Sequence, residues 1–306
     1  MGVSRRVLLA TAVAAVPASA VAQAFTVPRH VGAVTVAWQY ISNTGHRLSD
    51  GYYRPAGESV STSALAEVEY GVTARLSASV GIPYVWAKYT GAQPPPSGLP
   101  VDKCGCWNSS FADFGFSARY RFGGDTWAVT PLVRYGQPSH DYAYQGEAVV
   151  GRNLNELQLG VAGGLRLGGF LSRATLQATY GYSFVESPLP DVSIDKSTLF
   201  LDFGYAVGSR LYARAFGTGV YTHGGLRAGS PTGNPFPFPG ELAPIGGEKW
   251  LQRDRLLATK YWQLGGGLSY SLGSFDVFAS YSNYVWGRDA HNGWSLNLGT
   301  SWYFER

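Results

Sequence analysis

Two cysteines, Cys104 and Cys106, are the only cysteines of the chain, and one glycine separates them. Thiolates suit zinc or copper, but two ligands do not complete a metal site. The pair could also form a local disulfide, which an oxidising compartment permits, or remain as free or intermolecular thiols. The sequence leaves these three states open and identifies no metal.

Histidine and aspartate stand close together at two places, His140 beside Asp141 and Asp289 near His291. Such pairs could activate a water molecule in an outer-membrane hydrolase. Polar pairs in loops are more often simply solvated, and no Ser–His pair is presented for lipid hydrolysis. We therefore expect no enzyme, no catalytic residue and no cofactor, and keep a loop-based hydrolase as a minor alternative.

The composition restricts the class of protein. Of the 306 residues, 45% are hydrophobic and only 14% are charged, against about 25% in soluble domains. The net charge of +4 includes Arg5 and Arg6, which lie in a segment that we expect to be removed. So small a charge gives no reason to expect nucleic acid.

Residues 1–22 have the pattern of a secretory signal peptide: Arg5 and Arg6, an apolar stretch, and small residues ending at Ala20 or Ala22. Ser4-Arg5-Arg6 also resembles a twin-arginine motif, so the export route stays open. The expected mature domain is 23–306. Because no later segment is apolar enough to span a membrane as a helix, an exported chain of this kind is either periplasmic or an outer-membrane barrel.

Alternation of apolar and polar residues decides between these two classes. Between Arg75 and Tyr84, for example, Leu76, Ala78 and Val80 alternate with serines. About twelve such strands predict an all-β, antiparallel up-and-down transmembrane barrel without a plug domain. Pro131 predicts a bulge. The expected strands are 31–41, 61–72, 75–84, 113–122, 126–135, 156–167, 173–182, 199–205, 211–221, 263–271, 275–282 and 294–304.

The connections alternate between tight turns and long segments, as in barrels with short periplasmic turns and longer outer loops. Phe236 and Phe238 lie in the longest segment, 223–255, and could serve as a lid or a recognition loop. Aromatic residues gather near both expected interfaces of the bilayer. The expected long loops are 42–60, 89–109, 136–153, 186–197, 223–255 and 287–293.

Charged residues of both signs fall on the predicted inner face of the strands. They could form a transverse field for a solute or pair across the lumen, and we expect a mixture in which pairing is the larger share. The predicted pore-lining residues are Glu67, Glu69, Asp113, Arg119, Arg134, Glu156, Asp202, Arg214 and Asp276.

Three stretches resemble outer-membrane transporters of the phenol-degradation meta-pathway type: 68–84, 111–122 and 132–138. The resemblance implies a channel for small solutes, often aromatic or hydrophobic. Trp302-Tyr303-Phe304 resembles the carboxy-terminal signal read by the barrel assembly machinery, although Glu305 and Arg306 follow the aromatic residue.

The sequence thus predicts a channel in the outer membrane of a Gram-negative cell, reached by export across the inner membrane. Its expected partners are a small-molecule solute, outer-membrane lipid and the barrel assembly machinery, with no nucleic acid. The alternative is a closed barrel that binds or adheres through its long outer loops.

Overall fold

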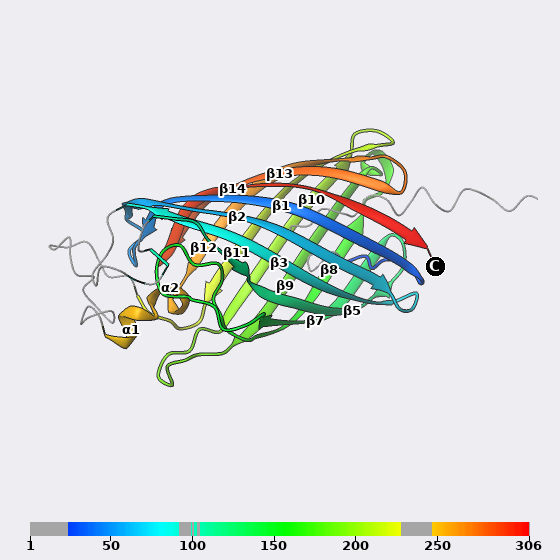
Figure 1. Ribbon diagram of the computed structural model, residues 1–306. Coiled ribbons are helices and arrows are strands. Elements are labelled where there is room, and N and C mark those ends of the chain that lie inside the picture. Colours follow the sequence, from blue (N-terminus) through cyan, green and yellow to red (C-terminus); the bar gives the residue numbers. More distant parts are fainter. Residues whose placement is uncertain (1–23, 92–98, 100, 103–104, 228–246, 306) are drawn as a thin grey trace, which may run out of the picture.

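The computed structural model describes residues 24–91, 99, 101–102, 105–227 and 247–305. The predicted signal peptide, Cys104, Phe236 and Phe238 lie outside these residues. The described chain forms one β-barrel of tilted strands, with two short helices at one end and the carboxy terminus at the other (Figure 1).

The strands and helices have these bounds: β1 Val31–Arg47, β2 Tyr53–Gly71, β3 Leu76–Thr90, β4 Asn108–Phe111, β5 Asp113–Tyr120, β6 Phe122–Gly123, β7 Trp127–Pro138, β8 Glu156–Arg166, β9 Ala174–Val185, β10 Lys196–Ala206, β11 Leu211–Thr222, α1 Glu248–Leu251, α2 Arg253–Leu256, β12 Lys260–Ser271, β13 Phe275–Arg288 and β14 Ala290–Glu305. A one-turn 3-10 helix, Gly169–Leu171, lies between β8 and β9.

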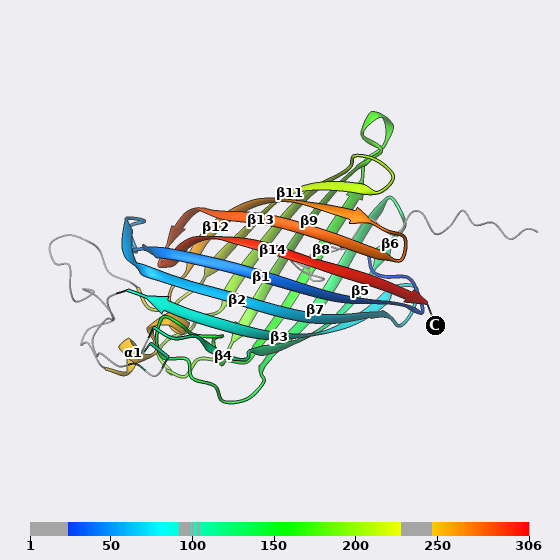
Figure 2. The same cartoon turned by 45° about the horizontal axis from the view of Figure 1, so that its top comes forward.

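All neighbours in the barrel are antiparallel, and the wall closes on itself. β14 pairs with β1, β1 with β2, and β2 with β3. β3 pairs with β4 and β5, and β7 pairs with β5 and β6, so β4, β5 and β6 are three pieces of one wall strand. The described residues therefore form a closed barrel of twelve strands, as predicted, and Figure 2 shows β14, β1, β2 and β3 side by side.

The outer surface of the barrel is apolar because alternate residues of each strand point away from the lumen. On β8, Leu157, Leu159 and Val161 are exposed, whereas Gln158 between them is buried. The same alternation on β12 exposes Leu264 and Leu268. In the described part of the chain, no helix is long and apolar enough to cross a membrane.

Pro131 does not cause the predicted bulge. It pairs with Val161 in regular register, and β5 and β6 share one register along β7. Since proline has no N–H to donate, the ladder opposite it is interrupted instead, which separates β5 from β6 at Arg121. The irregularities fall elsewhere, at Thr44 on β1 and Val285 on β13.

Two of the expected outer loops are wrong. The segment 42–60 is mostly strand, because β1 continues to Arg47 and β2 already begins at Tyr53. The segment 287–293 is a tight turn at Asp289, whose φ is 48°, between β13 and β14. The β1–β2 and β13–β14 hairpins therefore extend farther toward the outer end than the strands that the sequence predicts.

The first described residues, Ala24–Thr26, fold into the inner end of the barrel. Ala24 and Phe25 are buried against Ala128 and Ala162. The backbone N–H of Ala24 donates to Oε1 of Gln177 over 2.9 Å. These few residues narrow the lumen without forming a plug domain.

A charge on the outer wall should oppose insertion. Replacing Leu264, which is 53% exposed, by arginine is expected to cost about 2–4 kcal/mol of folding free energy in lipid vesicles. Gln263→Arg, the adjacent position on the lumen side, is the matched control and should cost much less. Urea titration of tryptophan fluorescence measures both, and equal losses would contradict the assignment of faces.

Candidate functional site

Glu69 and Arg119 form a buried ion pair inside the barrel. Glu69 comes from β2 and Arg119 from β5, and β3 lies between these two strands. The guanidinium donates to the Glu69 carboxylate, and the two residues are 7% and 2% exposed. A buried charge with an opposite charge in contact avoids the large penalty of isolation.

Asp202 and Arg214 form a second pair on the neighbouring strands β10 and β11. Nε of Arg214 donates to Oδ2 of Asp202 over 2.6 Å. The Arg214 guanidinium also lies 5.1 Å from the ring centroid of Phe216 and 5.7 Å from that of Phe200. These two rings stack at 6.0 Å, so this part of the lumen offers apolar rings beside a paired charge.

Glu156 forms a third pair, with a partner that sequence reasoning missed. Nζ of Lys196 lies 2.7 Å from Oε2 of Glu156. Lys196 fell in an expected loop, 186–197, whereas β10 begins at Lys196 itself. Residues 196–202 begin with three polar residues in a row and do not alternate, so the sequence pattern gave no signal that placed Lys196 on the strand.

The remaining predicted pore-lining residues are not brought together in one site. Asp113 accepts a hydrogen bond from the Tyr142 hydroxyl, and Asp276 is 3% exposed. Arg119 and Arg134 both act electrostatically on Glu67. Arg134 lies between Val133 and Tyr135, which face outward, so Arg134 faces the lumen. Its side chain is nevertheless exposed. The pore-lining role of the nine residues stays a prediction.

The outer end of the barrel is covered by a cap, defined here as residues 139–155, 186–195 and 247–259. Two apolar clusters hold it. Leu154, Leu189 and Ile194 are buried with Trp250 and Leu256 of the two helices. Ala148 is buried with Ala87 and Tyr89 of β3. The cap is thereby packed both on itself and on the wall.

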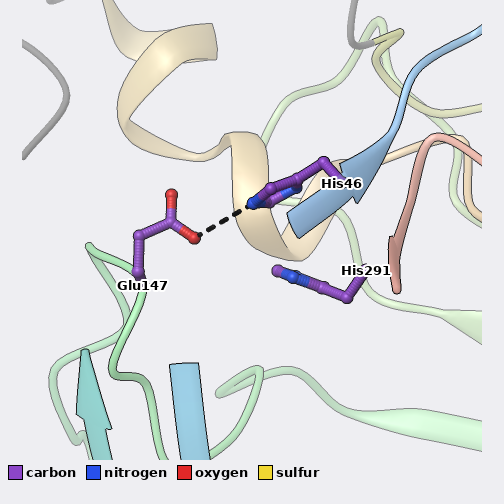
Figure 3. A group of neighbouring side chains, drawn as sticks. All are labelled: His46, Glu147 and His291. Atoms are coloured by element: carbon purple, nitrogen blue, oxygen red, sulfur yellow. Dashed lines mark ion pairs between the residues drawn. The ribbon is translucent and has the colours of Figure 1, made fainter. Parts of the chain in front are cut away.

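His46, Glu147 and His291 meet where the cap touches the wall (Figure 3). His46 on β1 and His291 on β14 are direct cross-strand partners with ring centroids 4.5 Å apart. Nε2 of His46 lies 3.6 Å from Oε2 of Glu147, which belongs to the cap. At about 3.3 Å per residue and a tilt of about 40°, the chain from Val31 to His46 rises about 38 Å, beyond an apolar band of about 25 Å.

Arg253 of α2 connects this group to the rest of the cap. It donates to Oε1 of Glu147 over 3.2 Å and to the Trp250 carbonyl over 3.1 Å, and its guanidinium lies 3.5 Å from Oδ2 of Asp254. The backbone N–H groups of Glu147 and Ala148 donate to the Asp102 carboxylate. His46, His291 and Arg253 thus surround the Glu147 carboxylate, while Asp102 holds the Glu147 backbone.

Burial and neighbouring charge set the ionisation of this group. Burial lowers the pKa of His291 to about 4. Burial also opposes a charge on His46, but contact with the Glu147 carboxylate outweighs it and raises the pKa of His46. The same contact, together with Arg253, overcomes burial and lowers the pKa of Glu147. Burial and the charge of Glu147 raise the pKa of Asp254 to about 7.

The expected hydrolytic pairs are engaged elsewhere. His140 contacts the hydroxyls of Ser139 and Ser110, at 2.8 and 3.1 Å. Its neighbour Asp141 accepts from Nδ2 of Asn153 over 2.7 Å. Asp289 accepts a hydrogen bond from Ser49, whereas His291 faces His46 and Glu147.

Cys106, one of the two cysteines of the chain, is disulfide-bonded.

Removal of one partner of a lumen pair should destabilise the barrel. Arg119→Met leaves Glu69 buried without its cation and is expected to cost about 3–5 kcal/mol of unfolding free energy. The double variant Glu69→Gln/Arg119→Met should recover much of this loss. Urea unfolding in detergent micelles measures both variants. Equal destabilisation of the single and double variants would show that the pair is not the cause.

Comparison by sequence finds no match, neither to a protein-family model nor to a curated protein. Comparison of structures finds similar proteins. The chain is similar to the COG4313 outer membrane channel from Pseudomonas putida F1, with a TM-score of 0.69, 13% identity, and 92% of this chain and 98% of that chain covered.

Two further barrels are similar at lower scores. The NanC porin has a TM-score of 0.51 and 12% identity, with 88% of this chain and 98% of that chain covered. The translocator domain of the autotransporter NalP from Neisseria meningitidis has a TM-score of 0.50 and 11% identity, with 91% and 90% covered. At these identities the likeness concerns the fold, and with the apolar outer wall it identifies the chain as an outer-membrane β-barrel.

Proposed function

We propose that this barrel is a channel for small solutes, and that aromatic or hydrophobic compounds are among them. One observation carries the proposal: Arg134 occupies an inward position of the wall and yet is exposed to solvent. Water therefore reaches a charged side chain inside the barrel.

The number of strands supports a narrow passage. A barrel of about eight strands is filled by its own side chains, whereas sixteen or more leave a wide aqueous channel. A wall of twelve strands lies between these limits. The paired charges Glu69–Arg119 and Asp202–Arg214 line such a lumen without presenting a strong field of one sign.

The aromatic part of the proposal is supported by the Phe200–Phe216 stack beside Arg214. Phe200 is only partly buried and offers a ring surface on which a flat apolar solute can pack, whereas Phe216 and the Arg214 side chain are buried and pack against that ring. The resemblance of three sequence stretches to phenol-pathway transporters favours the same solute class, and the fold shared with the COG4313 outer membrane channel supports a channel without indicating its solute.

Two features narrow the passage at its ends. Ala24 and Phe25 occupy the inner end, and the cap covers the outer end. The barrel therefore admits solutes of limited size. A surface-binding function through loop 223–255 remains the alternative, although Phe236 and Phe238, on which it depends, lie outside the described residues.

Reconstitution tests the channel directly. Mature protein in planar lipid bilayers is expected to give discrete current steps, and vesicles that contain it should swell in small solutes. Folding is checked beforehand by the mobility shift of unheated protein on gels. Folded protein that never conducts, even after deletion of residues 228–246, would contradict the channel and favour the surface-binding function.

Selectivity for aromatic solutes should depend on the stacked rings. Phe200→Ala/Phe216→Ala is expected to slow the entry of benzoate into vesicles relative to glucose, because the apolar contact surface in the lumen is lost. Phe203→Ala is the matched control on the same strand, since Phe203 is 42% exposed on the outer wall. An unchanged benzoate-to-glucose ratio in the double variant would remove the aromatic part of the proposal.

A further inference from the structure

We propose that His46, Glu147 and His291 form a binding site for a divalent transition-metal cation, with zinc the best fit, at the outer mouth of the barrel. Two imidazoles and one carboxylate are a donor set that zinc accepts, with a fourth position left for water or another ligand. None of the sequence motifs pointed to these residues as a group, because they lie far apart in the chain.

The positions of the donor atoms suit a single ion. One ligand atom from each residue can be chosen so that all three lie within 4.8 Å of one another. Donors bound to a tetrahedral zinc ion at about 2.0–2.1 Å lie about 3.3 Å apart. The 3.6 Å between Nε2 of His46 and Oε2 of Glu147 is already close to that value. The other donor pairs need to close by at most about 1.5 Å to reach the same spacing.

The two histidines are placed by the barrel wall itself. His46 and His291 are paired in the β1–β14 ladder, so their side chains leave the sheet on the same side. The extra residue at Thr44 shifts the register just below them. Two ligands on a rigid wall reduce the cost of organising the site when the ion binds.

The third donor is held by its surroundings. Oε1 of Glu147 accepts from Arg253 over 3.2 Å, while Oε2 faces His46. The Glu147 backbone is fixed at both ends, since its N–H donates to Asp102 over 2.8 Å and its carbonyl accepts from Ser59 over 2.9 Å. Hydrogen bonds of this kind orient metal-binding carboxylates in known sites.

The nearby cation Arg253 does not exclude a metal ion. Arg253 is shared between Glu147 and Asp254, and Asp102 also acts on it electrostatically. Three carboxyl groups therefore surround one guanidinium, and a divalent cation would reduce this excess of acidic groups. An ion-pair cluster without any metal affinity is the competing explanation, and it predicts no saturable binding.

Binding would join three segments of the chain that belong to two parts of the molecule. Glu147 belongs to the cap, whereas His46 and His291 belong to the wall, so the ion would fasten the cap to the rim of the barrel. If the proposed channel function holds, zinc should lower its conductance. The binding itself does not depend on that function and is tested separately.

Titration of the folded, metal-free mature protein with zinc chloride by calorimetry tests the site. We expect one ion per chain, and Co²⁺ in place of zinc should give the visible absorption of a four-coordinate centre. His46→Ala and His291→Ala should each weaken binding by about tenfold or more. His223→Ala is the matched control: His223 is also at the outer end but contacts Ser197, and its loss should leave zinc binding unchanged.

Three results would overturn the proposal: no saturable binding by the wild-type chain, equal affinity in the histidine variants, or binding that is lost only when Cys104 and Cys106 are replaced. His291→Cys guards against loss by misfolding. It restores a zinc ligand at the same position and should bind, whereas His291→Ala should not. Failure of His291→Cys to bind, in protein that shows the folded gel mobility, would also count against the site.

Discussion

The structure depends on one constraint: within a bilayer, every backbone N–H and C=O must find its partner inside the protein. A sheet with a free edge would leave a row of such groups in hydrocarbon, at several kcal/mol for each. Closure through β2 and β3 removes both edges. With strands, that constraint is satisfied by closure. Closing a sheet in which all neighbours are antiparallel requires an even strand number, and contact with lipid requires the apolar outer wall.

Closure also explains how far the sequence could predict the fold. A strand in a barrel has one face toward lipid and one toward the lumen. Apolar and polar residues therefore alternate in its sequence, as in Leu157, Gln158 and Leu159. The sequence predicts about twelve strands, and the described chain forms a barrel of twelve. The effect of Pro131 was not predictable in detail, because an interrupted ladder and a bulge are both consistent with a missing donor.

Alternation was a weaker guide beyond the membrane. The β1–β2 and β13–β14 hairpins continue above the apolar band, where both faces can be polar and the period carries less information. For that reason the sequence predicts a loop at His46, which in the structure lies on β1. Glu147 could not have been placed beside the histidines, since only the folding of the cap brings them together.

The interior combines two kinds of restraint. Along the wall, acidic and basic side chains pair between strands, which offsets part of the cost of burying each charge. At the outer end, apolar clusters and the Glu147–Arg253 contact hold the cap against the rim. For the proposed channel, the cap at one end and Ala24 and Phe25 at the other are therefore the expected points of restriction.

Spin labels placed along β2 test the central claim most directly. In a chain without Cys104 and Cys106, labels at Ser61, Ser63 and Glu67 should be relaxed by a water-soluble nickel complex. Labels at Ala64, Ala66 and Val68 should be relaxed by oxygen dissolved in the lipid. The account predicts that the two accessibilities alternate with a period of two residues and in opposite phase. Accessibilities that rise and fall together along the strand would contradict a wall with lipid outside and water within.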